Sequence, residues 1–361
     1  MNSMPQHPRS LSTRRREFVF ACVPLLVLLA IGELLARSLH EGHAFWPLRS
    51  GSYRDQRIDL IRRCYPAAHD QLLGFVPRAG FASAENRWSV MVSIDTNGLR
   101  TNGRSPRPPG ACGVLAVGDS YTFGDQVADE QTWPARLEQR LQRPVWNGGV
   151  FRYSFAQTVL RAEQLLDRLP IDTLVVSLIP YDIKRCEMSK RFTEVPWYDV
   201  VAGELVLRNV PVPDSADPAR NRQYVRQLLG YSALCDTLFW KTVPAWWVGD
   251  QSEVYVHAPG TGSVIADKLL DRLAATCRRR GIALLLVLQG GVPEPAAWEW
   301  ADGEKLLAHC REIGVQFLDL QSAFGVLAAA DPSLRQKYFA GHMSPAGNAW
   351  VADQIAVALV H

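Results

Sequence analysis

The sequence predicts an α/β protein: a three-layer α/β/α sandwich with a parallel sheet, an N-terminal membrane anchor and an inserted hairpin and helical segment. Short, almost wholly apolar runs such as TLVVSLI at 173–179 alternate with stretches of helical periodicity. Strands that are apolar throughout are typical of a parallel sheet covered by helices on both faces. With 361 residues, 47% of them hydrophobic, the chain is long enough to bury one large core.

The anchor is predicted from residues 18–36, an apolar run directly after three consecutive arginines at 14–16. As a helix these roughly 19 residues would extend about 29 Å, close to the hydrocarbon thickness of a bilayer. Glu33 is the only charge in the run, and no small-x-small cleavage site follows cleanly. We therefore expect residues 1–16 to be cytoplasmic, 17–37 to be a transmembrane signal anchor, and the body to be exported. A cleaved signal peptide is the alternative.

An exported prefix is expected at 38–110. Its segment RWSVMVSIDTNGLR alternates in polarity and carries Asn97-Gly98, a hairpin or tight-turn signal. The main domain follows at 111–361, with an insertion at about 183–263 that contains a hairpin around Ala202-Gly203 and a helical, aromatic-rich stretch.

The main domain is predicted to repeat a β-α pattern. Its expected strands are at 113–117, 145–147, 173–179, 282–288 and 315–318, and its expected helices are at 130–141, 155–169, 264–280, 305–313 and 345–360. Pro345 suits the first turn of the last helix.

Charge and cysteine usage exclude some classes of function. The formal net charge of +3 is too small to argue for nucleic-acid binding, and no C-x-x-C or H-x-x-x-H pair indicates a metal site. Six cysteines in an exported body permit three disulfides. The sequence leaves two states of these cysteines open. Cys277 and Cys310, on helices flanking one strand, could form a disulfide, or the cysteines could be buried, fully reduced thiols.

The chemistry is centred on VLAVGDSYTFGDQV, residues 114–127. A buried strand ends at Gly118-Asp119-Ser120 and a helix pattern follows, which lifts the Ser120 hydroxyl onto the rim of the sheet, where α/β proteins place their ligands. His342 lies near the C-terminus. A serine is a weak nucleophile until a base takes its proton, so such a pair makes chemical sense.

Four ordered segments resemble the blocks of the SGNH (GDSL-type) hydrolase family: GDSYTFGDQV, Asn147-Gly148-Gly149-Val150, a strand ending near Asp182, and GHMSPAGN. The segments LLGFVP, TNGLR and ELVLRNVPVP also resemble membrane-anchored members associated with bacterial surface polysaccharides. The resemblance implies that Ser120 is the nucleophile and His342 the general base, with backbone N–H groups at Ser120 and after Asn147, including Gly149, stabilising an oxyanion. It implies no cofactor and no metal.

Three positions depart from the family pattern. The family acid stands two or three residues before the histidine, where this chain has Ala340 and Phe339. The second-block glycine corresponds to Arg152, and the family asparagine falls at Tyr181. Because Arg152 beside a nucleophile is poorly explained by packing, an anionic ligand such as a uronate is one hypothesis.

Two other carboxylates are candidates to replace the missing acid. Asp182 and Asp319 both follow strands at the rim of the sheet, so either is a possible substitute, while helix capping is the structural alternative for each.

Two functions are open from the sequence. The first is an esterase or O-acyltransferase acting on an ester, most simply acetyl, of a surface polysaccharide at the periplasmic side of a bacterial inner membrane. As a transferase it would accept acetyl groups from a membrane-bound O-acyltransferase partner, which the resemblance alone suggests. The second is a catalytically degenerate protein of the same fold that binds carbohydrate or an assembly partner.

Overall fold

A computed structural model describes residues 11–41, 52–86, 88–103, 112–214, 224–248, 253–290 and 297–360. It divides into a small unit, residues 1–59 with 222–250, and a large unit, residues 60–221 with 251–361. The Pro-rich stretch at 104–110 within the predicted prefix lies outside the described residues.

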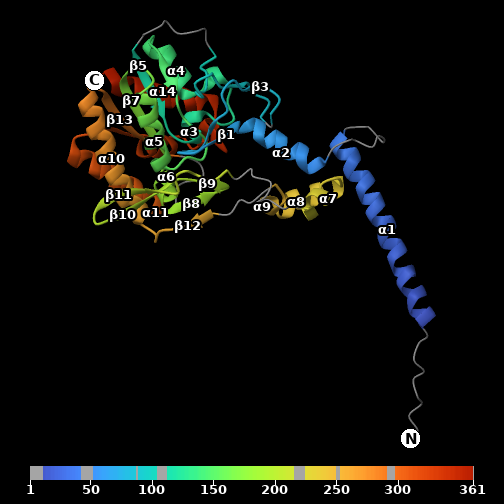
Figure 1. Ribbon diagram of the computed structural model, residues 1–361. Coiled ribbons are helices and arrows are strands. Elements are labelled where there is room, and N and C mark those ends of the chain that lie inside the picture. Colours follow the sequence, from blue (N-terminus) through green and yellow to red (C-terminus); the bar gives the residue numbers. More distant parts are fainter. Residues whose placement is uncertain are drawn as a thin grey trace. The chain divides into compact units, whose positions relative to one another are not determined.

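The large unit is built on one five-stranded sheet in the order β14-β13-β7-β5-β6 (Figure 1). All four neighbouring pairs are parallel. The strands are β5 (Gly113–Val117), β6 (Val145–Asn147), β7 (Ile171–Leu178), β13 (Ala283–Leu288) and β14 (Gln316–Asp319). Strand β5 lies inside the sheet, so the residues after it open onto the rim formed by the carboxyl ends of the strands.

Helices cover both faces of this sheet (Figure 1). On β5, Leu115 and Val117 belong to a core shared with α5 (Phe155–Leu166), α10 (Thr261–Arg280) and α11 (Ala297–Ile313). The alternate residues Val114 and Ala116 belong to a second core shared with α4 (Trp133–Leu141), α12 (Leu320–Ala330) and α14 (Pro345–Val360). Because side chains alternate along a strand, apolar residues at every position supply both cores at once.

Smaller elements surround the sheet. The short helices and 3₁₀ turns are α3 (Ser120–Phe123), η1 (Asp129–Gln131), α6 (Pro180–Lys184), η2 (Arg185–Glu187) and α13 (Ser333–Tyr338). The hairpins are β1–β2 (Ala67–Asp70, Gly74–Pro77), β3–β4 (Ala82–Ser83, Val92–Ser93), β10–β11 (Trp197–Val201, Glu204–Arg208) and β15–β16 (Phe339–Ala340, His342–Met343). Strands β8 (Met188–Arg191), β9 (Thr193–Glu194) and β12 (Glu253–Tyr255) form an antiparallel sheet in the order β12-β8-β9.

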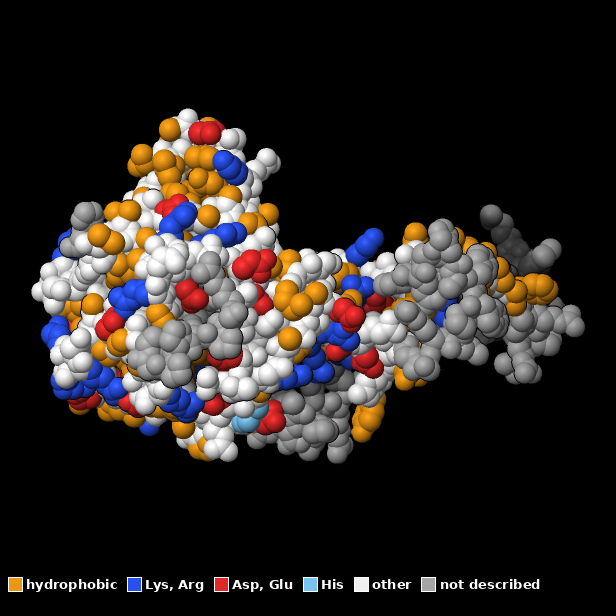
Figure 2. All heavy atoms as spheres, turned by 90° about the horizontal axis from the view of Figure 1, so that it is seen from above, with side chains coloured by type: hydrophobic (Ala, Val, Ile, Leu, Met, Phe, Trp, Pro, Cys, Tyr) orange, Lys and Arg blue, Asp and Glu red, His pale blue; other side chains and the backbone are white. Residues whose placement is uncertain are grey.

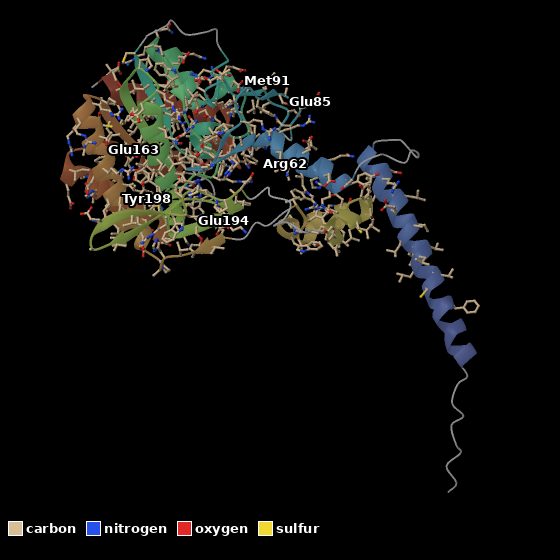
Figure 3. The ribbon with its side chains drawn as sticks, viewed as in Figure 1. Arg62, Glu85, Met91, Glu163, Glu194 and Tyr198 are labelled. Atoms are coloured by element: carbon tan, nitrogen blue, oxygen red, sulfur yellow. The ribbon has the colours of Figure 1, made fainter. Side chains whose placement is uncertain are left out.

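The β10–β11 hairpin is tied to the helical layer by one arginine. Arg272 on α10 donates to Glu163 Oε1 on α5 at 2.8 Å and to the Tyr198 hydroxyl on β10 at 2.8 Å; Figure 3 labels both partners. On the face shown in Figure 2, basic and acidic side chains are interspersed rather than gathered.

The small unit consists of α1 (Leu11–Glu41), the start of α2 (Tyr53–Cys64), α7 (Tyr224–Leu229), α8 (Ala233–Thr242) and α9 (Pro244–Val248). Glu33 on α1 accepts hydrogen bonds from the Ser232 hydroxyl at 2.6 Å and from the first two N–H groups of α8. Ala36 is buried against Tyr53 and Ala233. A carboxylate at a helix N-terminus is a favourable arrangement, so these contacts join α8 to the C-terminal part of α1.

The predicted three-layer α/β/α architecture with a parallel sheet is confirmed. The predicted strands and most of the predicted helices are found with ends shifted by up to three residues, whereas the helix expected at 305–313 begins eight residues earlier, at Ala297 of α11. The hairpin around Ala202-Gly203 is present, with both residues at positive φ. Helix α12 was not predicted. A bridge between Cys277 and Cys310 is not formed, since all seven cysteines are free thiols.

Candidate active site

Ser120 is presented by a tight turn from strand to helix. Gly118 follows β5, and a Cβ atom there would lie 2.3 Å from the Ser177 carbonyl oxygen, so only glycine permits this close approach. Asp119 caps the single turn of α3 by accepting the Tyr121 N–H at 2.9 Å. Ser120 is thereby the first helical residue, and its N–H has no partner within the helix.

His342 lies opposite Ser120 on a two-residue strand of the β15–β16 hairpin. Its Nε2 atom is 3.1 Å from Ser120 Oγ, within hydrogen-bond distance although the two residues are 222 positions apart. The His342 N–H donates to Gln126 Oε1 at 3.4 Å, and its ring is 5.4 Å from that of Tyr121. With an unprotonated Nε2, this histidine is placed to take the serine proton during attack on a carbonyl.

The carboxylate closest to the histidine among the described residues is Asp125. Its Oδ2 lies 3.7 Å from His342 Nε2, the nitrogen that also faces the serine. Asp125 is fully buried, and this burial raises the pKa of its carboxyl to about 6, although the charges of His342, Arg100 and Arg152 oppose the shift. An ionised Asp125 therefore stabilises the imidazolium that forms on proton transfer, but it does not hold the ring through Nδ1.

The two substitute acids suggested by the sequence lie in other contacts. Asp182 is buried, pairs with Arg185, and accepts the Ile179 N–H at 3.1 Å. Burial, together with neighbouring Asp119, raises the pKa of Asp182. Asp319 caps α12 by accepting the Ser322 N–H at 2.9 Å and its hydroxyl at 2.6 Å. Both carboxylates therefore cap helices, which is the alternative to a catalytic role that the sequence left open.

The loop after Asn147 uses most of its own backbone donors. Gly149 donates its N–H to Asn147 Oδ1 at 3.1 Å, and the neighbouring N–H groups of Gly148 and Val150 donate to Ala116 and Gly118 carbonyls. Asn147 is fully buried and fixes this loop in place. The hydrogen bonds among the described residues leave the N–H groups of Ser120 and Arg152 as the donors available to an oxyanion.

Arg152 has a backbone conformation that glycine favours. Its φ of +66° lies in the left-handed region, which costs a non-glycine residue about 1 kcal/mol or more. This agrees with a position held by glycine in related motifs. Its guanidinium lies 4.6 Å from the Tyr65 ring centroid and 4.0 Å from that of Phe192.

The Tyr181 hydroxyl faces Glu253 on β12, with 3.3 Å to Oε1 and 3.4 Å to Oε2. Burial and the negative charge of Glu253 raise the pKa of this tyrosine. The Tyr181 hydroxyl therefore donates toward the Glu253 carboxylate and does not serve as an oxyanion donor.

Sequence reasoning missed Asp125 and the arginine that holds its loop. Arg100 is fully buried, pairs with Asp129 at 3.1 Å, and donates to the carbonyls of Phe123, Gly124 and Val127. These carbonyls flank Asp125. Asp125 follows Ser120 by five residues in the same motif, and this proximity was the available signal. Among the described residues no group of three or more His, Cys, Asp or Glu side chains is arranged to hold a metal ion.

Comparison with solved structures returns proteins named as lipolytic proteins and esterases. No family model and no curated protein matches the chain. Among solved structures, it is similar to a putative lipolytic protein of the G-D-S-L family from Desulfitobacterium hafniense DCB-2 (12% identity, 68% of this chain and 98% of that chain, TM-score 0.35). The acetyl xylan esterase AlAXEase has 14% identity over 68% and 99% of the chains (TM-score 0.40), and the SGNH-hydrolase family esterase AlinE4 has 16% over 71% and 97% (TM-score 0.35). Two of these neighbours are named as members of the G-D-S-L or SGNH-hydrolase family. At these identities and TM-scores, the likeness carries no argument about what this chain does.

We predict that Asp125→Asn lowers kcat/KM in a pH-dependent way. Above pH 6 the wild-type carboxylate is ionised and stabilises protonated His342, whereas below pH 6 it is neutral like asparagine. The ratio of wild-type to variant kcat/KM on 4-nitrophenyl acetate should therefore rise through about pH 6 to a plateau of about tenfold. A ratio that stays constant from pH 5 to 8 would contradict this role, and Asp331→Asn, an exposed acid-to-amide change, is the matched control.

Proposed function

We propose that this chain is a membrane-anchored serine esterase or O-acyltransferase that acts on an ester, most simply acetyl, of a surface polysaccharide. The observation that supports the proposal is the 3.1 Å separation between Ser120 Oγ and His342 Nε2. The ionisable carboxylate of Asp125 at 3.7 Å adds a charge that favours the protonated histidine.

The proposed reaction has two steps. Ser120 Oγ attacks the ester carbonyl while its proton moves to His342 Nε2; the C–O bond to the leaving alcohol breaks, and that oxygen takes the proton from His342. The N–H groups of Ser120 and Arg152 would stabilise the oxyanion. Water or a sugar hydroxyl then attacks the acyl-enzyme and gives its proton to His342, which returns it to Ser120 Oγ. The choice of acceptor distinguishes hydrolysis from transfer.

The proposed location is the periplasmic side of a bacterial inner membrane. Among the described helices, α1 is long and apolar enough to cross a bilayer: its window Cys22–Leu39 has a mean hydropathy of 1.9 and is 6% buried. Its side chains project outward with few neighbours (Figure 3). Helices α7 to α9 in the same unit also expose Tyr224, Leu228 and Trp246, residue types favoured at a membrane surface. A membrane-bound O-acyltransferase would be the source of acetyl groups if the enzyme is a transferase.

A binding protein without chemistry is the second candidate. The engaged N–H groups of residues 148–150 and the absence of a carboxylate at Phe339 and Ala340 favour it. In that case the fold would hold an acylated carbohydrate or an assembly partner without turnover.

A fluorophosphonate probe separates these candidates. Such a probe forms a covalent bond with an activated serine and needs little substrate recognition. We expect intact mass spectrometry of the full chain in detergent to show one adduct, absent from Ser120→Ala and retained in Ser333→Ala, a serine outside the site. If the folded protein gains no adduct, or if the Ser120→Ala variant still gains it, the enzymatic proposal is contradicted and the binding protein is favoured.

A further inference from the structure

Arg152 and Phe192 are two non-glycine residues with left-handed backbones whose side chains contact one another. Their φ angles are +66° and +65°, and the Arg152 guanidinium lies 4.0 Å from the Phe192 ring centroid. Phe192 occupies the turn between β8 and β9. Each such conformation costs on the order of 1 kcal/mol and tends to persist where function requires it.

Two aromatic rings contact the Arg152 guanidinium. Tyr65 and Phe192 each contact it through an aromatic ring, at 4.6 Å and 4.0 Å. Within the part of the chain that the structure describes, Arg152 makes no hydrogen bond and no ion pair. Its side chain is partly exposed. Because these ring contacts engage no oxygen acceptor, the guanidinium N–H groups are able to donate to a planar or tetrahedral anion.

The nearby arginines differ from Arg152 in having carboxylate partners. Arg185 pairs with Asp182 and lies 3.7 Å from Asp119 Oδ2, and Arg191 donates to Glu253 Oε1 at 3.2 Å. Those charges are compensated within the protein. The positive charge of Arg152 is not, apart from the longer-range attraction of Asp125.

Arg152 is also close to the catalytic pair. Burial and the negative charge of nearby Asp125 raise the pKa of Tyr65, whose ring contacts Arg152, and Asp125 Oδ2 lies 3.7 Å from His342 Nε2. One aromatic side chain thus separates the free guanidinium from the carboxylate next to the catalytic histidine.

We propose that Arg152, in contact with the rings of Tyr65 and Phe192, binds an anionic group of the acylated substrate and places the neighbouring ester at Ser120. The inference rests on the proposed function for its choice of substrate. A carboxylate on a sugar ring, or a sulfate or phosphate ester, has the chemistry that a guanidinium edge recognises. The substrate class is therefore an acylated polyanionic glycan rather than a neutral one.

The test measures oligosaccharide binding to a variant that lacks the serine nucleophile, so that binding is separated from catalysis. Full-length Ser120→Ala protein in detergent is titrated calorimetrically with trigalacturonate, with its carboxyl-reduced counterpart of the same skeleton, and with a glucose trisaccharide bearing one phosphate monoester. We expect either charged probe to bind at least about 10-fold more tightly than the neutral one. The carboxylate and phosphate arms identify which anion is preferred.

Substitutions at Arg152 assign the effect to this side chain. Arg152→Gln in the same background should remove the preference for the charged probe, and Arg152→Lys should restore it only in part, because lysine keeps the charge without the planar donors. Arg143→Gln, at a partly exposed ion pair with Asp172, is the matched control and should retain the preference.

Equal binding of charged and neutral probes, or an unchanged preference in Arg152→Gln, would overturn the inference. Circular dichroism and the thermal midpoint establish that each variant is folded. Since the fluorophosphonate experiment reports activation of Ser120 alone, loss of the proposed function and loss of the anion site are seen as separate outcomes.

Discussion

Replacing His342 with glutamine is expected to lower kcat/KM on 4-nitrophenyl acetate by about 10²- to 10³-fold. A positioned general base contributes about 10²- to 10⁴-fold. We expect the lower part of this range because Phe339 and Ala340 provide no carboxylate for Nδ1, and loss of the orienting acid costs about 10⁴-fold in complete triads. Ser120→Ala should lose a similar amount, since the two side chains form one unit at 3.1 Å.

The double variant tests whether the pair acts as a unit. Removal of both side chains should lower kcat/KM by no more than removal of either one, because effects within one catalytic unit are not additive. Losses that add in Ser120→Ala/His342→Gln would mean that the two residues act separately, which would contradict the proposed proton transfer. His309→Gln is the matched control, since His309 on α11 interacts with Asp271 at 2.9 Å.

The parallel sheet could be predicted from the sequence because its strands are apolar at every position. Side chains of Val114 to Val117 belong to the cores on both faces of the sheet. A strand that is apolar on both faces is typical of a parallel sheet covered by helices on both sides. Helix α12 was missed for the opposite reason. Its sequence LQSAFGVLAAA is apolar on most sides, so no 3.6-residue periodicity identifies it, and it follows β14 without a turn signal.

The serine and histidine could be predicted, but their electrostatic surroundings could not. Ser120 and His342 each stand in a recognisable motif. The role of Asp125 depends on how the loop after α3 folds back, and this is set by Arg100, 25 positions earlier in the chain. No local pattern encodes such a contact. The helix-capping roles of Asp182 and Asp319 likewise became visible only with their hydrogen-bond partners.

Replacing Arg100 with methionine is expected to lower the free energy of unfolding by about 3–5 kcal/mol. The change leaves Asp129 buried without its cation, 3.1 Å from where the guanidinium stood, and removes the donor from three loop carbonyls. Urea denaturation followed by circular dichroism measures the loss. Arg143→Met, at a partly exposed ion pair, should cost less than about 1 kcal/mol.

A second substitution separates stability from the positioning of Asp125. Arg100→Met/Asp129→Leu removes both charges of the buried pair and should recover much of the stability lost in Arg100→Met, since the largest cost of a broken buried pair is the charge left alone. It does not restore the contacts of Arg100 with the carbonyls on either side of Asp125. We therefore expect the double variant to be stable, while the ratio of its kcat/KM to that of the same variant carrying Asp125→Asn no longer shows a rise through about pH 6. If that rise persists in a stable double variant, the loop holds Asp125 beside His342 without Arg100, and the arginine serves the fold alone.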